Sequence, residues 1–269
     1  MDPSISILLT VITIIYGLYI ILQLIVGIFL VIKAKTTKLY NIIYLALFFI
    51  VSSMQGLLSY GNFSNLIFQA IYFLPTIFLL LFIKQTFYRD KKSPFYIYLT
   101  IILSLKLVNF LISVYVAPFT IPMSFQTSKV EKFYFIIYKL IITINLAIAE
   151  IWFGYSSLKY YFQIKDREIA PWIKKRYQII GYSALILLIE AIAISFLPPS
   201  AEGLYHPQAL MIGIIIAITT LFFSICSGLA WMMPENLKKY FNKDLEQPQE
   251  KSLTEEEIIN KIKEELSKG

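Results

Sequence analysis

The sequence predicts an all-α polytopic membrane protein: a bundle of seven transmembrane helices with the N-terminus outside and the C-terminus in the cytoplasm. First, 58% of its 269 residues are hydrophobic and 15% are charged, whereas soluble domains contain about 25% charged residues. Second, the apolar residues form runs of about twenty, long enough as helices to cross a hydrocarbon core of about 30 Å. Third, Lys and Arg gather in alternate connections between the runs, as membrane topology requires.

Seven apolar segments are expected to form the spans, in the ranges 5–32, 41–59, 66–83, 95–118, 132–157, 177–197 and 209–233. The first has neither a basic leader nor a small-residue cleavage site, so we expect a retained helix and not a signal peptide. The third contains Pro75, and a neighbouring helix is expected to satisfy the backbone groups that a proline frees. These spans define a membrane domain over residues 1–241, followed by a cytoplasmic linker and short helix over 242–269.

The distribution of Lys and Arg sets the predicted orientation. Sixteen of them fall in the first, third and fifth connections and just after the last span, whereas only Lys129 and Lys132 fall in the other connections. Basic residues favour the cytoplasmic side. We therefore expect the odd connections and the C-terminus inside.

The fifth connection, residues 158–176, is predicted to be the longest inside loop. Its charges anchor the adjacent spans, but Asp166 and Glu168 add acidic groups that anchoring does not need. The alternative is a surface that a cytoplasmic signalling protein binds. The candidate docking residues are Trp172, Lys174, Lys175 and Arg176.

The C-terminal tail is expected to contain a second docking surface. Thr254 and Glu257 fit a capping box, and Ile258, Ile262 and Leu266 form one apolar stripe of a helix. A helix this short is marginal in isolation, which favours docking on another surface. The alternative is a solubilising tail.

Four ionisable residues lie inside predicted spans, where charges are costly and usually face the bundle interior. They are Lys106, Lys139, Glu150 and Glu190. Lys139 and Glu190 lie at the same depth on consecutive helices, about 10 Å from the outer ends. We therefore expect an ion pair between them.

Other polar residues share helical faces with these four. Asn109 lies three residues after Lys106, and Gln55, Gln69 and Tyr72 lie on faces of the second and third spans. Together they predict a ligand-binding pocket in the outer half of the bundle. In the alternative interpretation, these groups only fix the register of the helices, at about 0.6 kcal/mol per polar contact.

The sequence lacks the motifs of most catalytic and cofactor sites. The single cysteine, Cys226, has no partner for a disulfide, and no metal-ligand cluster, phosphate-binding loop or nucleophile motif is present. The positive charge lies in short connections and not in a groove with exposed aromatics, which argues against nucleic acid as a partner. We expect no enzyme activity, no catalytic residues, no metal and no cofactor.

Three stretches resemble the seven-helix N-terminal membrane region of prokaryotic sensor histidine kinases. They are IYFLPTIFLLLFIKQTFYRDKKSPF, WIKKRY and LAWMMPENLKKYF, and the resemblance covers about residues 5–243. It implies a sensor that passes a signal to a cytoplasmic output. Because a tail and not a kinase domain follows here, the resemblance further implies that a separate partner supplies the output.

Three functions remain open. The leading prediction is a receptor-like sensor in the cell membrane, with the polar pocket as input and with residues 158–176 and the tail as output. The second is a small-molecule or ion transporter that uses the intramembrane Lys and Glu residues; the odd number of helices without repeats weakens it. The third is a membrane scaffold that recruits a partner through its tail helix.

Overall fold

The computed structural model describes residues 3–60, 71–89, 92–112, 129–197 and 207–243. Within these ranges the protein is all-helical, with eight α-helices and no strands. The helices are α1 (Pro3–Thr37), α2 (Asn41–Tyr60), α4 (Leu74–Phe87), α5 (Phe95–Leu111), α6 (Lys129–Ile164), α7 (Pro171–Ser195), α8 (Pro207–Met232) and α9 (Glu235–Asn242).

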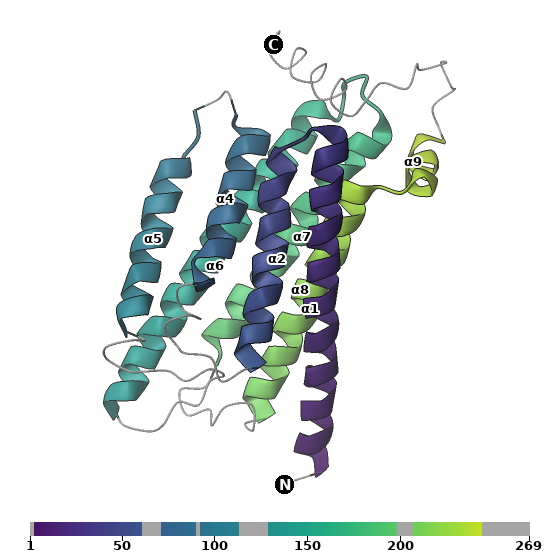
Figure 1. Cartoon of the computed structure of the whole chain (residues 1–269). Coiled ribbons are helices and arrows are strands. Elements are labelled where there is room, and N and C mark those ends of the chain that lie inside the picture. The colour runs from purple at the N-terminus through teal and green to yellow at the C-terminus, as the bar shows by residue number, and fades with distance from the viewer. Residues whose placement is uncertain (1–2, 61–70, 90–91, 113–128, 198–206, 244–269) are drawn as a thin grey trace.

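Helices α1 to α8 form one bundle in which consecutive helices run in opposite directions (Figure 1). Helix α7 packs between α6 and α8, while α1 packs against both α2 and α8. Helix α4 contacts α2 and α6, and α5 lies at the edge against α6. The short α9 packs on α7 at the end of the bundle that also contains the C-terminal end of α1.

Five helices are long and apolar enough to cross a membrane, namely α1, α2, α6, α7 and α8. This is the composition of a multi-pass membrane protein. Helices α4 and α5 are equally apolar but have only 14 and 17 residues, about 21 and 25 Å at 1.5 Å per residue. The predicted number of seven spans therefore stays a prediction.

The connection between α6 and α7 is much shorter than predicted. Helix α6 continues to Ile164 and α7 begins at Pro171, so the connection contains residues 165–170 and not 158–176. Proline suits the first turn of a helix because its missing N–H is not needed there. The predicted boundaries followed apolar composition alone, which cannot detect helices that continue beyond their apolar stretch.

The largest core cluster combines aliphatic side chains with aromatic rings from α2, α4, α5, α6 and α8. Phe82 of α4 makes edge contacts with Phe153 of α6 and Trp231 of α8, at ring-centroid distances of 5.7 and 5.6 Å. Phe49 of α2 stacks on Phe223 of α8 at 5.8 Å. Such aromatic pairs contribute about 0.5–1.5 kcal/mol each beyond the area that they bury.

Helices α6 and α7 approach each other closely at two glycines. A Cβ atom on Gly154 would lie 2.7 Å from the Leu185 side chain, and one on Gly181 would lie 2.6 Å from that of Leu158. Small residues allow such close packing of transmembrane helices. The two helices therefore form a tightly packed pair over this stretch.

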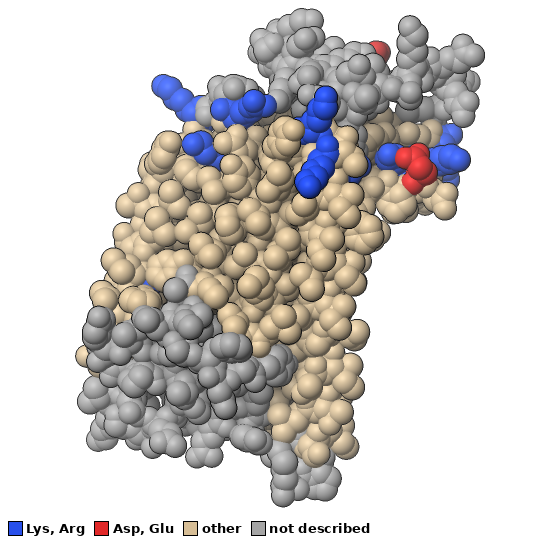
Figure 2. All heavy atoms as spheres, viewed as in Figure 1, with Lys and Arg blue, Asp and Glu red and all other residues tan. Residues whose placement is uncertain are grey.

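Lys and Arg side chains gather at one end of the molecule, the end that contains α9 (Figure 2). We call it the basic end. The long sides of the visible face are almost free of charge, as expected of a surface in contact with lipid. The described residues therefore form an apolar bundle with basic side chains gathered at the end that contains α9.

Candidate functional site

Lys106 on α5 is buried, and it donates a hydrogen bond to a backbone carbonyl and not to a carboxylate. Its Nζ lies 2.7 Å from the carbonyl oxygen of Tyr72. It also lies 4.2 and 5.8 Å from the ring centroids of Tyr72 and Phe73. The helical conformation is interrupted at Phe73, just before α4 and Pro75. The carbonyl that Pro75 leaves without a helical donor is that of Ile71, four residues earlier, whereas Lys106 binds the next carbonyl along the chain. Compensation for Pro75 by a neighbouring helix therefore stays a prediction.

Lys139 on α6 also donates a hydrogen bond to a backbone carbonyl and not to a carboxylate. Its Nζ donates to the carbonyl oxygen of Leu197 at 2.9 Å. Leu197 lies just beyond the C-terminal end of α7, where carbonyl groups lack helical partners and the helix dipole favours a cation. Lys139 therefore caps α7.

Arg176 on α7 is the third such cation and is only 2% exposed. Its Nε donates to the carbonyl oxygen of Ala230 at 3.0 Å. Four residues later comes Pro234, which has no N–H to donate to that carbonyl. The guanidinium carbon lies 4.8 and 5.0 Å from the ring centroids of Trp172 and Trp231. We call Trp172, Arg176 and Trp231 the cation–aromatic cluster.

The predicted ion pair between Lys139 and Glu190 is wrong. Lys139 binds Leu197, and the carboxylate Oε2 of Glu190 instead accepts a hydrogen bond from Thr220 Oγ1 at 3.0 Å. The equal depth of the two residues in their predicted spans was insufficient to predict the pairing. Backbone carbonyls at the breaks and ends of helices lack a helical hydrogen-bond donor, and they compete with the carboxylates for the cations. The three cations bind these carbonyls, and neither carboxyl group pairs with a cation among the described residues.

Glu150 and Glu190 form what we call the carboxyl pair. Glu150 on α6 is 3% exposed, and its buried Oε2 has no hydrogen-bond partner among the described residues. Glu190 on α7 lies close enough for the two charges to interact, and Tyr72 lies within the same electrostatic range. Within the described part of the chain, no Lys or Arg forms an ion pair with either carboxyl group.

The remaining predicted polar residues are only partly brought together. Asn109 is buried and donates from Nδ2 to the carbonyl oxygen of Tyr138 at 3.2 Å, while its Oδ1 has no partner. Gln55 lies on α2, and its Nε2 is buried without a partner. Gln69 lies outside the described residues. The bundle therefore contains several buried polar atoms that have no hydrogen-bond partner among the described residues.

Two polar residues of the bundle are absent from the predicted site. The hydroxyl of Thr220 on α8 donates to Glu190. Asn145 on α6 is 3% exposed and its Oδ1 has no partner. A polar side chain within an apolar helix was the available signal for both.

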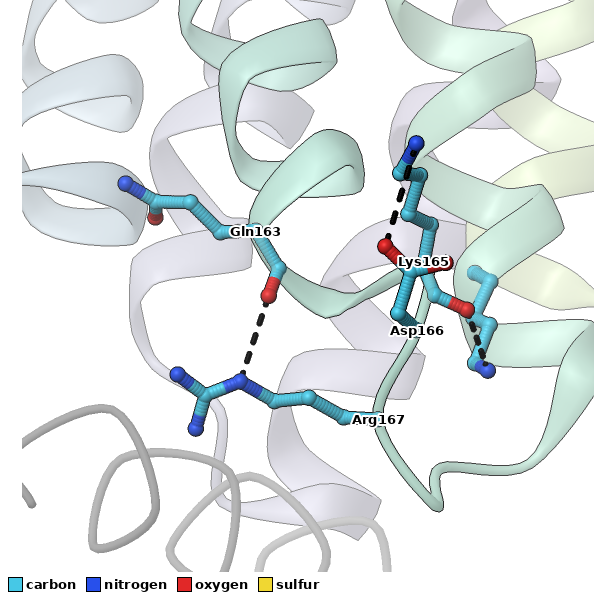
Figure 3. A network of polar contacts seen from close by, with 5 residues as sticks. Gln163, Lys165, Asp166 and Arg167 are labelled. Atoms are coloured by element: carbon cyan, nitrogen blue, oxygen red, sulfur yellow. Dashed lines mark hydrogen bonds and ion pairs between the residues drawn. The ribbon is translucent and has the colours of Figure 1, made fainter. Parts of the chain in front are cut away.

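The connection between α6 and α7 is held by its own short-range contacts (Figure 3). Arg167 Nε donates to the Gln163 carbonyl oxygen at 3.2 Å, and Lys165 Nζ lies 3.8 Å from Asp166 Oδ2. Lys174 Nζ reaches back from α7 to the carbonyl oxygen of Lys165 at 2.7 Å. The connection is therefore tied to the start of α7.

The predicted docking surface needs a correction. Trp172 and Arg176 are buried, so a partner cannot contact them at the surface. Lys175 is exposed and donates to Gln178 Oε1 at 2.9 Å, and Lys174 is half-buried. Docking through these two lysines stays a prediction. The tail residues Ile258, Ile262 and Leu266 lie outside the described residues.

The described residues contain no group of three or more His, Cys, Asp or Glu that could hold a metal ion. The carboxyl pair offers oxygen acceptors and negative charge inside a low-dielectric bundle. Such a site can hold a proton or a small cation, or accept hydrogen bonds from a ligand.

Comparison with known proteins finds no family model, no curated protein and no solved structure that matches this chain. The resemblance to the membrane region of sensor kinases therefore stays a prediction. The functional argument rests on the geometry of the bundle alone.

Proposed function

We propose that this protein is a receptor-like sensor of the cell membrane, with the carboxyl pair as its input site and the basic end as its cytoplasmic output. One observation carries the proposal. Two carboxyl groups on the packed helices α6 and α7 have no basic partner among the described residues, although three cations lie in the same bundle. An uncompensated carboxylate in low dielectric is costly. A bound proton or small cation balances it, so binding there changes the free energy of the bundle.

The position of the carboxyl pair supports a route to the output. Glu150 lies on α6 and Glu190 on α7, the two helices that meet closely at Gly154 and Gly181. The same helices are joined at the basic end by residues 165–170. A shift of α6 against α7 at the carboxyl pair therefore moves the connection, as packed helices transmit displacements as rigid elements.

The proposed sidedness follows from charge. Lys and Arg gather at the end that contains α9 and the α6–α7 connection (Figure 2). Basic residues favour the cytoplasmic side, which puts the start of α1 outside and the output connection inside.

A fluorescence experiment tests the proposal. Cys226 is replaced by Ser, and Glu168, an exposed residue of the connection, is replaced by Cys and labelled with an environment-sensitive dye. The labelled protein in nanodiscs should change its emission when pH or Na⁺ concentration is varied. Glu150→Gln and Glu190→Gln should each suppress the change, while Glu235→Gln, the same substitution outside the spans, should preserve it. If the labelled protein with both glutamates intact shows no change in emission with pH or Na⁺, the proposed sensor function is refuted.

A second candidate is a proton or cation transporter, which the unpartnered Glu150 Oε2 favours. A carboxyl group that exchanges a proton or cation between the two sides needs an acceptor atom that no fixed partner occupies. Proteoliposomes containing a pH-sensitive dye separate the two functions. Proton flux that Glu150→Gln abolishes indicates a transporter, whereas the labelled connection responding without flux indicates a sensor.

A further inference from the structure

Helix α9 leaves the bundle sideways at the basic end. It begins after Pro234 and packs against α7, and Figure 1 shows it beside the end of the bundle. Leu237 and Phe241 contact the apolar cluster that contains Trp172 and Met233. In a bilayer, a short helix beside the end of a span lies among the lipid headgroups.

The two faces of α9 are unequally covered by protein. Leu237 and Phe241 face the bundle, but Tyr240 is 62% exposed. Aromatic residues such as Tyr are enriched at the membrane–water interface, where the ring is apolar and the hydroxyl is hydrated. The exposed ring therefore fits the interface and not the bulk water.

The lysine side chains on α9 and directly after it differ in the contacts that they make with other residues. Lys238 donates to Glu235 Oε1 at 2.7 Å and lies 5.1 Å from the centroid of the Trp172 ring. Lys239 and Lys243 are exposed, and Lys243 Nζ lies 5.3 Å from the Tyr240 ring centroid. Lys33 of α1 is near enough to interact electrostatically with Glu235. The end of α1 therefore adds positive charge to the same side.

We propose that α9 is an interfacial helix that binds anionic phospholipid headgroups of the surrounding bilayer through Lys239 and Lys243. Lys238 fixes the helix on Trp172, Tyr240 enters the interface, and the two exposed ammonium groups face the phosphates. The positive charge of α9 complements the negative surface of an anionic leaflet. The inference requires that the bundle spans a membrane, and it is independent of the proposed sensor function.

Electron paramagnetic resonance with spin-labelled lipids tests the inference on the full chain. The protein is reconstituted in phosphatidylcholine, and the protein-associated fractions of labelled phosphatidylglycerol and phosphatidylcholine are compared at low salt. Wild type should prefer phosphatidylglycerol. Lys239→Gln with Lys243→Gln should weaken this preference, by up to about fivefold per lysine. The matched control, Lys165→Gln with Lys175→Gln, removes two exposed lysines from the basic end but none from α9 and should retain the preference.

The charge-preserving variant Lys239→Arg with Lys243→Arg separates binding from folding, because it should behave as wild type. The inference is overturned by an absent preference in wild type, or by equal losses in the control and α9 variants. It is also overturned if inorganic phosphate removes the preference more than chloride does at equal ionic strength, since that result would indicate a site for small anions.

Discussion

The cation–aromatic cluster at the basic end and the carboxyl pair within the bundle differ in how far their charged groups are satisfied by partners. Arg176 has a carbonyl acceptor and two indole rings around its guanidinium group. Glu150 keeps a buried carboxyl oxygen that has no hydrogen-bond partner among the described residues. A satisfied buried charge stabilises a particular packing, whereas an unsatisfied one leaves binding capacity for something else. On this basis we propose a structural role for the cation–aromatic cluster and a binding role for the carboxyl pair.

The largest expected effect is the loss of the cation–aromatic cluster. Arg176→Ala removes two cation–π contacts and leaves the Ala230 carbonyl without a partner, because Pro234 cannot donate to it. We expect a loss of about 3 kcal/mol in unfolding free energy. SDS-induced unfolding monitored by circular dichroism measures it. Lys175→Ala, a neighbouring exposed position, should cost less than about 0.5 kcal/mol; equal stabilities of the two variants would show that the cluster is not structural.

A smaller effect is expected at Lys139. Lys139→Met removes the hydrogen bond to the Leu197 carbonyl and should cost about 1 kcal/mol. Because Glu190 binds Thr220 and not Lys139, the costs of Lys139→Met and Glu190→Gln should add to within about 0.5 kcal/mol. The same unfolding assay on both single variants and the double variant gives the coupling energy. A coupling energy clearly above about 0.5 kcal/mol would indicate that the two side chains do form an ion pair, which would contradict the structure.

Substitution within the carboxyl pair should affect stability less than the loss of Arg176 or Lys139, while affecting function most. Glu150→Gln keeps the shape of the side chain and removes a charge that has no basic partner. We expect the unfolding free energy to stay equal or to rise by about 1 kcal/mol, as at other sites where function is favoured over stability. A loss comparable to that of Arg176→Ala would make Glu150 an architectural residue.

The smallest effect concerns the first turn of α9. The hydrogen bond from Lys238 holds the pKa of Glu235 below its ordinary value of 4.5. A carboxyl group with a lowered pKa stabilises the folded helix at pH values above that ordinary value and loses the effect as pH falls through the lowered pKa. The protection factors of the amides of residues 235–242, which are exchange rates corrected for the intrinsic pH dependence, should therefore fall on acidification more in wild type than in Glu235→Gln. Identical pH profiles of wild type and Glu235→Gln would show that Glu235 does not stabilise α9 in this way.

Much of the fold follows from hydropathy, because a helix that crosses a bilayer needs a long apolar run. The helical class, the apolar segments and the position of the charges were predictable on this basis. The ends of α6 and α7 were not, because both helices extend beyond their apolar stretches through residues such as Tyr160 and Lys174 that carry no hydropathy signal.

The site was predictable in its residues but not in its pairings. The intramembrane Lys and Glu residues were recognisable by the cost of burying them. Their partners depended on where helices break or end: at Phe73, at Leu197 and before Pro234. Every residue has a backbone carbonyl, so a sequence does not show which carbonyls lack a helical hydrogen-bond donor. The carbonyls that bind the cations could therefore be identified only from the three-dimensional structure.

Infrared difference spectroscopy tests the central claim most directly, namely that the carboxyl pair exchanges a proton or a small cation while the cation–aromatic cluster stays unchanged. Membranes containing the protein are cycled between two pH values and between low and high Na⁺, and the stretching band of protonated carboxyl groups is recorded. We predict a difference band in wild type that is lost in both Glu150→Gln and Glu190→Gln and preserved in Lys175→Ala. A band that survives both glutamine substitutions, or no band in wild type, would contradict the claim.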